Sequence, residues 1–192
     1  DGGKLQVDFK LSADGGQETA SGDVPLRMYG PSDIVGIDPR QIVRTYPEPE
    51  ETDLPPNYFA AVEFDAASLP WLFSPVSDDD QGRALPWCGL VVLNQTEKTK
   101  VQPSGDGPLP TVKAPTSELP PVKEMWAWVH AQMVGGPANP SASAVRDKFG
   151  KSSTATRSRL ISPRNLQPNE AYVAAVVPLF KGGQQAGQGN DP

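Results

Sequence analysis

The stretch RNLQPNEAYVAAVVPLF, residues 164–180, decides the fold that we predict for this chain. In immunoglobulin- and fibronectin-like sandwiches, a tyrosine near the start of a strand returns its hydroxyl to the backbone a few residues upstream. The spacing Leu166-x-Pro168-Asn169-x-x-Tyr172 fits this tyrosine corner. Leu166 would fill the end of the core, and Pro168-Asn169 would form the turn, because asparagine tolerates the left-handed region. The stretch therefore predicts a chain crossing between two sheets, with a strand beginning at Tyr172.

Short apolar runs separated by turns extend this prediction to the rest of the chain. In KLQVDFKL, residues 4–11, the apolar side chains alternate with polar ones, which indicates a half-buried strand. VPLRMYG, residues 24–30, alternates in the same way, and the polar segment between the two runs reads as a hairpin loop. The continuous apolar run PWCGLVVL, residues 86–93, predicts a strand buried on both faces. Further strands are predicted within residues 38–47, 57–65 and 159–163.

The period changes in ELPPVKEMWAWVHAQMVGG, residues 118–136. One helical stripe is formed there by Val122, Met125, Trp126, Val129 and Met133. A second short helix with a serine cap is predicted in SASAVRDKFG, residues 141–150. The fold predicted is an all-β sandwich, immunoglobulin- or fibronectin-like, with a helix or helix pair inserted around residues 120–150. We expect a single domain over residues 1–192 with its helical insertion at 118–150.

The charge is acidic and unevenly distributed. The formal net charge is −6, and the basic residues concentrate after residue 140. An acidic majority argues against a nucleic-acid binder, which needs clustered Lys and Arg against phosphates. The basic group consists of Arg146, Lys148, Lys151, Arg157, Arg159 and Arg164. It could face solvent, which we favour, or dock on an acidic partner or on this chain's own acidic part.

Cysteine usage and hydropathy bound the location of the protein. Cys88 is the sole cysteine, so no internal disulfide can form, and we expect it to be a small buried hydrophobe. The absence of a disulfide framework suits a cytoplasmic protein. No apolar run approaches the roughly 18 residues of a membrane helix. The start without Met leads us to expect a fragment of a longer protein.

Candidate catalytic and metal-binding residues are few. His130 is the only histidine, so a zinc set or a Ser-His-Asp triad has little support. Residues 149–153 contain a Gly-Lys-Ser sequence but lack the earlier glycine of a phosphate loop. Asp78-Asp79-Asp80 could hold an ion loosely, although the spacing of a calcium loop is missing. Glu63 and Asp65 could serve a glycosidase, but alternation on an outer sheet face explains them equally well. We predict no catalytic residue, no metal and no cofactor.

The four tryptophans are the remaining candidates for binding. Trp126 lies on the predicted helical stripe, which indicates a core residue. Trp128 lies off that stripe, and Trp71 lies in a segment bent by prolines, so both are candidate contact residues for a partner.

Several longer phrases resemble a known family. They are residues 24–49, 56–75 (PNYFAAVEFDAASLPWLFSP), 85–93 (LPWCGLVVL), 125–132 (MWAWVHAQ) and 159–189. Together they resemble the N-terminal domain of an uncharacterised protein family encoded with phage-tail-like extracellular contractile injection particles. The resemblance implies a role around a tail-like assembly, such as a baseplate, cap or accessory component, and it supplies no catalytic residues.

The function expected from these observations is a non-catalytic structural or assembly module that binds protein partners of a phage-tail-like particle. Nucleic acid and membrane are not expected as partners. The alternatives are a carbohydrate-binding module, which would line up exposed aromatic side chains on one sheet face, and a hydrolase, which would place Glu63 and Asp65 or His130 in a polar cleft.

Overall fold

The computed structural model contains two compact units, Asp1–Gly30 and Pro31–Pro192. The residues that it describes are 2–13, 16–27, 33–34, 36–55, 57–74, 82–103, 109–136, 138–151 and 155–189. Most of the regular structure is antiparallel strand in several sheets, with short helices between them. The chain is therefore β-rich, as the sequence predicts.

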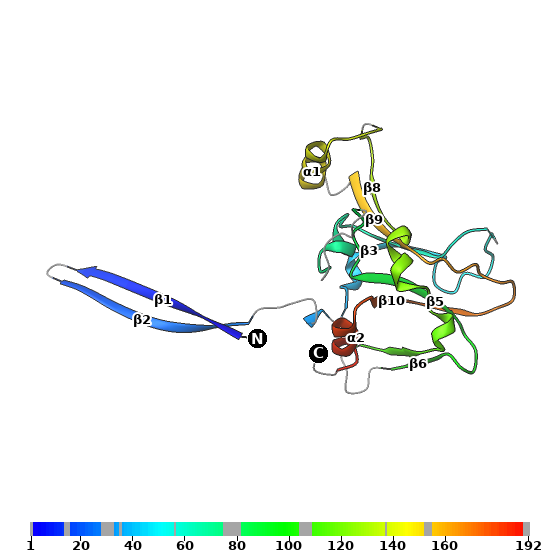
Figure 1. The fold of residues 1–192 in the computed structure, drawn as a ribbon, viewed down its shortest axis with the longest axis horizontal. Helices are drawn as coiled ribbons and strands as arrows, with labels where there is room; N and C mark the ends of the chain where they lie inside the picture. The colour runs from blue at the N-terminus through cyan, green and yellow to red at the C-terminus, as the bar shows by residue number, and fades with distance from the viewer. Residues whose placement is uncertain are drawn as a thin grey trace. The chain divides into compact units, whose positions relative to one another are not determined.

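The first unit is one long β-hairpin (Figure 1). Strands β1 (Gly2–Ala13) and β2 (Gly16–Arg27) pair antiparallel along their whole length. The register sets Leu5 opposite Val24 and Phe9 opposite Ala20. Most of the segment that the sequence predicts to be a polar loop, residues 13–23, is therefore strand.

The second unit is organised by a four-stranded antiparallel sheet in the order β3-β4-β9-β8. Its strands are β3 (Ile42–Tyr46), β4 (Ala61–Phe64), β8 (Val129–Met133) and β9 (Thr156–Ile161). Burial alternates along β4 and β9, because successive side chains of a strand point to opposite faces. The sheet thus has one face that carries Val62, Phe64 and Leu160 into the core.

Two smaller sheets and several short helices complete this unit. The smaller sheets pair β5 (Cys88–Asn94) with β10 (Tyr172–Pro178), and β6 (Lys100–Gln102) with β7 (Thr111–Lys113). The α-helices are α1 (Ala142–Lys151) and α2 (Lys181–Gly187). The 3-10 helices are η2 (Pro39–Gln41), η3 (Leu69–Trp71), η4 (Thr116–Glu118) and η5 (Val122–Trp128). Ser141 caps α1 as predicted, its Oγ accepting the N–H of Ala144 at 3.2 Å.

The core lies between the four-stranded sheet and β5. One cluster of buried side chains joins Phe64 of β4, Leu160 of β9 and Val129 of β8 to Cys88 and Leu90 of β5. Strand β5 is buried from Cys88 to Leu93, as its continuous apolar run predicts. The Met125 side chain packs directly over Gly89, where a Cβ would collide with the Met125 methyl group.

The tyrosine corner predicted from residues 164–180 is present. The Tyr172 hydroxyl accepts a hydrogen bond from the backbone N–H of Gln167 at 2.8 Å. Asn169 has φ of 59°, within the left-handed region that its turn requires. Leu166 is half-buried and packs against the core cluster. The corner connects β9 to β10, which begins at Tyr172.

The predicted helix over residues 122–133 is wrong. Residues Val122–Trp128 form the 3-10 helix η5, and Val129–Met133 form strand β8, which pairs with β9. Of the predicted stripe, only Met125 and Val129 are buried. The hydrogen bonds that β9 offers along its free edge outweigh the local helical pattern, since tertiary context routinely overrides propensity.

Two further segments differ from the prediction. The sequence pattern assigns no regular structure to residues 98–115, yet β6 and β7 pair there. The C-terminal helix α2 was not predicted, because three of its seven residues are glycine. Its Gly183 is buried where a Cβ would lie 2.9 Å from Pro178 and from the Phe180 ring, so this position requires glycine.

Candidate functional site

The hairpin of β1 and β2 carries an exposed apolar face. We define the apolar face as Leu5, Val7, Phe9, Leu11, Val24 and Leu26, which the register places on one side of the hairpin. Leu11 is 68% exposed, Phe9 59% and Leu5 49%, and only Val7 is half-buried. These are side chains that a folded domain normally removes from water.

The opposite side of the hairpin is polar. Lys4 forms an ion pair with Asp23 across the strands at 3.5 Å, and the Gln6 amide donates to the Asp8 carboxylate at 3.4 Å. Both interactions are exposed and contribute little to stability. The period-2 pattern of the sequence therefore produces a two-sided ribbon whose two faces differ in chemistry.

An isolated two-stranded hairpin is at best marginally stable in water, and it normally needs a third strand or a packed face. Large exposed apolar patches mark sites of protein interaction. The apolar face is thus the candidate functional site of the described chain. The alternation in residues 4–11 and 24–30 predicts which residues share the face, but it also led us to expect a half-buried strand, and the structure leaves the face exposed within its own unit.

The tryptophans are placed differently from the sequence prediction. Trp126, expected in the core, is 39% exposed, and the Arg83 guanidinium lies 4.8 Å from its ring centre. Trp128 is half-buried and meets the Phe59 ring edge-to-face at 5.6 Å. Trp71 is half-buried against the core, and its indole N–H donates to the Ala84 carbonyl at 3.2 Å. Trp71 and Trp128 therefore make contacts within this chain and are only partly available to a partner.

The carboxylates considered for hydrolysis are both paired with arginines of β9. Glu63 accepts the Arg159 Nε–H at 2.9 Å and a second, shorter hydrogen bond from the same guanidinium. Asp65 forms an ion pair with Arg157 at 3.1 Å. His130 is exposed on the edge strand β8, with its Nε2 3.1 Å from the Ala127 carbonyl oxygen.

These ion pairs also show where part of the basic group after residue 140 lies. Arg164 adds a third pair, with its Nη2 2.8 Å from a Glu118 carboxylate oxygen. Three arginines after residue 140 thus neutralise acidic residues from earlier in the same chain. The expectation that the whole basic group faces solvent does not hold for these three side chains, because they are only 26–39% exposed.

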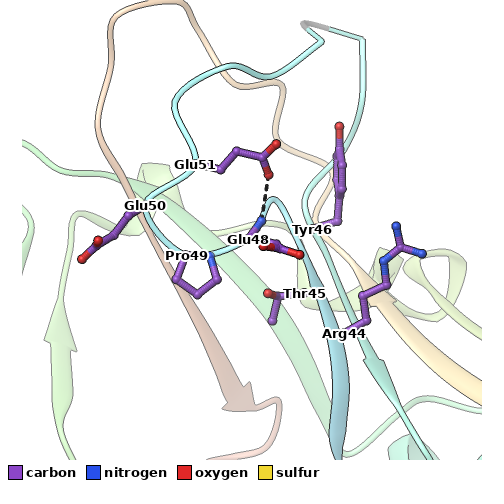
Figure 2. Close-up of a pocket in the computed structure, with 7 residues that line it drawn as sticks. All are labelled: Arg44, Thr45, Tyr46, Glu48, Pro49, Glu50 and Glu51. Carbon is purple, nitrogen blue, oxygen red and sulfur yellow. Dashed lines mark hydrogen bonds between the residues drawn. The ribbon is translucent and has the colours of Figure 1, made fainter.

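A pocket of about 540 Å³ lies beside the end of β3 (Figure 2). It is lined by Arg44, Thr45, Tyr46, Glu48, Pro49, Glu50 and Glu51. The Glu51 carboxylate accepts the backbone N–H of Glu48 at 3.0 Å, which closes the loop on itself. Desolvation and the nearby Glu51 raise the pKa of Tyr46 above its usual value. The lining is acidic and would attract a cationic group, although Figure 2 shows the Glu50 side chain directed away from those of Glu48 and Glu51.

The remaining candidates offer no site. Burial raises the pKa of the Cys88 thiol to about 12, so this cysteine is a neutral core side chain at pH 7. Among the residues that the structure describes, no three His, Cys, Asp or Glu side chains are grouped to hold a metal. Asp78-Asp79-Asp80 and Ser152 of the Gly-Lys-Ser sequence lie outside the described residues. No helix in the described ranges has the length and apolar character needed to cross a membrane.

Comparisons of this chain with protein-family models, with curated proteins and with solved structures gave no match.

Proposed function

We propose that this chain is a non-catalytic assembly module that binds protein through the apolar face of its hairpin. The observation behind the proposal is that five large apolar side chains of one hairpin face are 42–68% exposed. Burying a side chain of this kind stabilises a complex by about 1.5–3 kcal/mol when exposure is complete, and by about half of that here. The resemblance of the sequence to a family encoded with phage-tail-like particles supports such a particle as the setting.

We also propose that the second unit is a β-sandwich of the immunoglobulin-like kind. Two features support this arrangement. The tyrosine corner leads from β9 of the four-stranded sheet into β10, which pairs with β5. Side chains of β4 and β9 share one buried cluster with side chains of β5.

Co-purification from the gene cluster that encodes the chain tests the proposed function. A tagged chain should recover proteins of a tail-like particle, untagged copies of the chain, or both. The variant L5S/F9S/L26S should lose them, because serine removes the apolar contact while keeping the strand register. The matched control Q6A/K10A/T19A changes three residues on the polar face and should keep them.

Recovery of the same proteins by the L5S/F9S/L26S variant would overturn the proposal. Circular dichroism of both variants shows whether the second unit remains folded, so that a loss of binding is not mistaken for a loss of fold.

A further inference from the structure

We infer that the occupant of the apolar face is the apolar face of a second copy of this chain. The inference rests on the proposed function, since it names the partner of the same face. It predicts a two-fold dimer in which two hairpins stack face to face with their tips at the same end. The evidence lies in the distribution of large and small residues along the two strands.

The apolar face has a ridge on β1 and a groove on β2. Opposite Val7 stands Gly22, and opposite Phe9 stands Ala20, so these two large residues of β1 pair with small residues of β2, whereas Leu11, toward the tip, stands opposite Glu18. A Cβ built on Gly22 meets no atom within 4 Å, which shows that the groove is open in this structure. Toward the open end of the hairpin, Leu5 stands opposite Val24, so both strands carry a large residue and there is no groove.

A two-fold axis parallel to the strands sets β1 of one copy over β2 of the other. Val7 then lies over the Gly22 position of the second copy, and Phe9 over its Ala20 position, so that each ridge enters the opposing groove. Stacked sheets lie about 10 Å apart, which large side chains fill only where they face small ones. A perpendicular axis would instead set ridge against ridge and Val7 against Val7. The residue pattern therefore selects the parallel arrangement.

The area of contact indicates a weak dimer. Each strand has 12 residues. At about 3.4 Å per residue and about 4.8 Å per strand, the face has a footprint of about 400 Å². Two faces bury about 800 Å², which is less than the about 1,200 Å² of a stable specific interface. We therefore expect a weak, reversible dimer that forms only at high chain concentration.

Sedimentation velocity of the full 192-residue chain over a concentration series tests the inference. The wild-type chain should convert from monomer to dimer as its concentration rises, and F9S should remain monomeric. The decisive variant is G22V. Valine adds apolar surface and suits a strand. If the chains associate through nonspecific hydrophobic contact, G22V should therefore lower the dissociation constant. If the groove must be empty to receive the second copy, G22V should raise the dissociation constant about tenfold or more. T19V, which replaces a hydroxyl with a methyl group and so adds apolar surface on the polar face, should leave the dissociation constant unchanged.

The outcomes separate this inference from the proposed function. A wild-type chain that is monomeric at every concentration, or a G22V chain that associates more tightly, would overturn the self-pairing. The proposed function would still stand if the L5S/F9S/L26S variant lost its co-purifying proteins. It would fall with the inference only if that variant recovered the same proteins as the wild type.

Discussion

Single residues fix the turn between β9 and β10. Tyr172 supplies a hydroxyl that accepts the Gln167 N–H, and Asn169 holds a backbone conformation that most side chains disfavour. We expect Tyr172→Phe to lower the free energy of unfolding by about 1 kcal/mol, the net contribution of one hydrogen bond. Asn169→Ala should cost up to about 1–2 kcal/mol, because alanine keeps the Cβ that disfavours the left-handed region but lacks the polar side chain that offsets this cost in asparagine. Urea denaturation measures both.

Asn169→Gly is the matched control, since glycine adopts the left-handed region freely. It should leave the free energy of unfolding nearly unchanged. An equal loss for alanine and glycine at this position would show that the amide side chain, and not the backbone angle, holds the turn.

The corner could be predicted from sequence because its determinants are local. Leu166, Asn169 and Tyr172 lie within seven positions, and the turn chemistry is set by the residue types themselves. The tryptophans could not be assigned in the same way. A helix period of 3.6 places Trp126 inward and Trp128 outward, but η5 has the tighter 3-10 period, which aligns residues three apart. Trp128 therefore shares the side of Met125, and Trp126 turns toward solvent.

At the scale of elements, the segment from η5 to β8 shows how pairing between distant strands decides local structure. Val129–Met133 pairs with Thr156–Ile161, and that partner lies more than twenty residues further along the chain. Periodicity within a window of residues carries no information about such a partner. Strands β4, β5, β9 and β10 could be predicted because their apolar patterns agree with their pairing.

The packing of η5 against the loop before β4 depends on the Phe59 and Trp128 rings. We expect a double-mutant cycle of Phe59→Ala and Trp128→Ala to give a coupling energy of about 0.5–1.5 kcal/mol, the usual value for an edge-to-face pair. The measurement is the free energy of unfolding of the two single variants and the double variant. Trp126→Ala combined with Phe59→Ala serves as the comparison and should show additive effects.

A coupling energy near zero for Phe59 and Trp128 would mean that the two rings do not stabilise each other in solution. Trp128 would then again be a candidate contact residue for a partner protein, as the sequence predicts.

At the scale of the whole molecule, the sequence predicts the faces of the strands but not what covers them. The alternation in residues 4–11 is the same whether the apolar side meets this chain's own core or another protein. The structure assigns the core of residues 31–192 to other strands, with Phe64, Leu90 and Leu160 fully or almost fully buried. Among the residues that the structure describes, the buried cluster draws its members from residues 31–192, so the candidate site emerges only when the two units are considered separately.

This division makes a prediction about stability. Removing residues 1–30 should change the free energy of unfolding of residues 31–192 by less than about 1 kcal/mol, which corresponds to a shift in the thermal midpoint of about 2–4 °C or less. The reason is that every described residue of the buried cluster belongs to the second unit. Thermal unfolding followed by circular dichroism and by intrinsic tryptophan fluorescence, to which the buried Trp87 contributes, measures the shift. A single domain over residues 1–192, as the sequence led us to expect, would instead lose its cooperative transition or fall by far more. That outcome would place the apolar face against this chain's own second unit and leave it unavailable to a second copy.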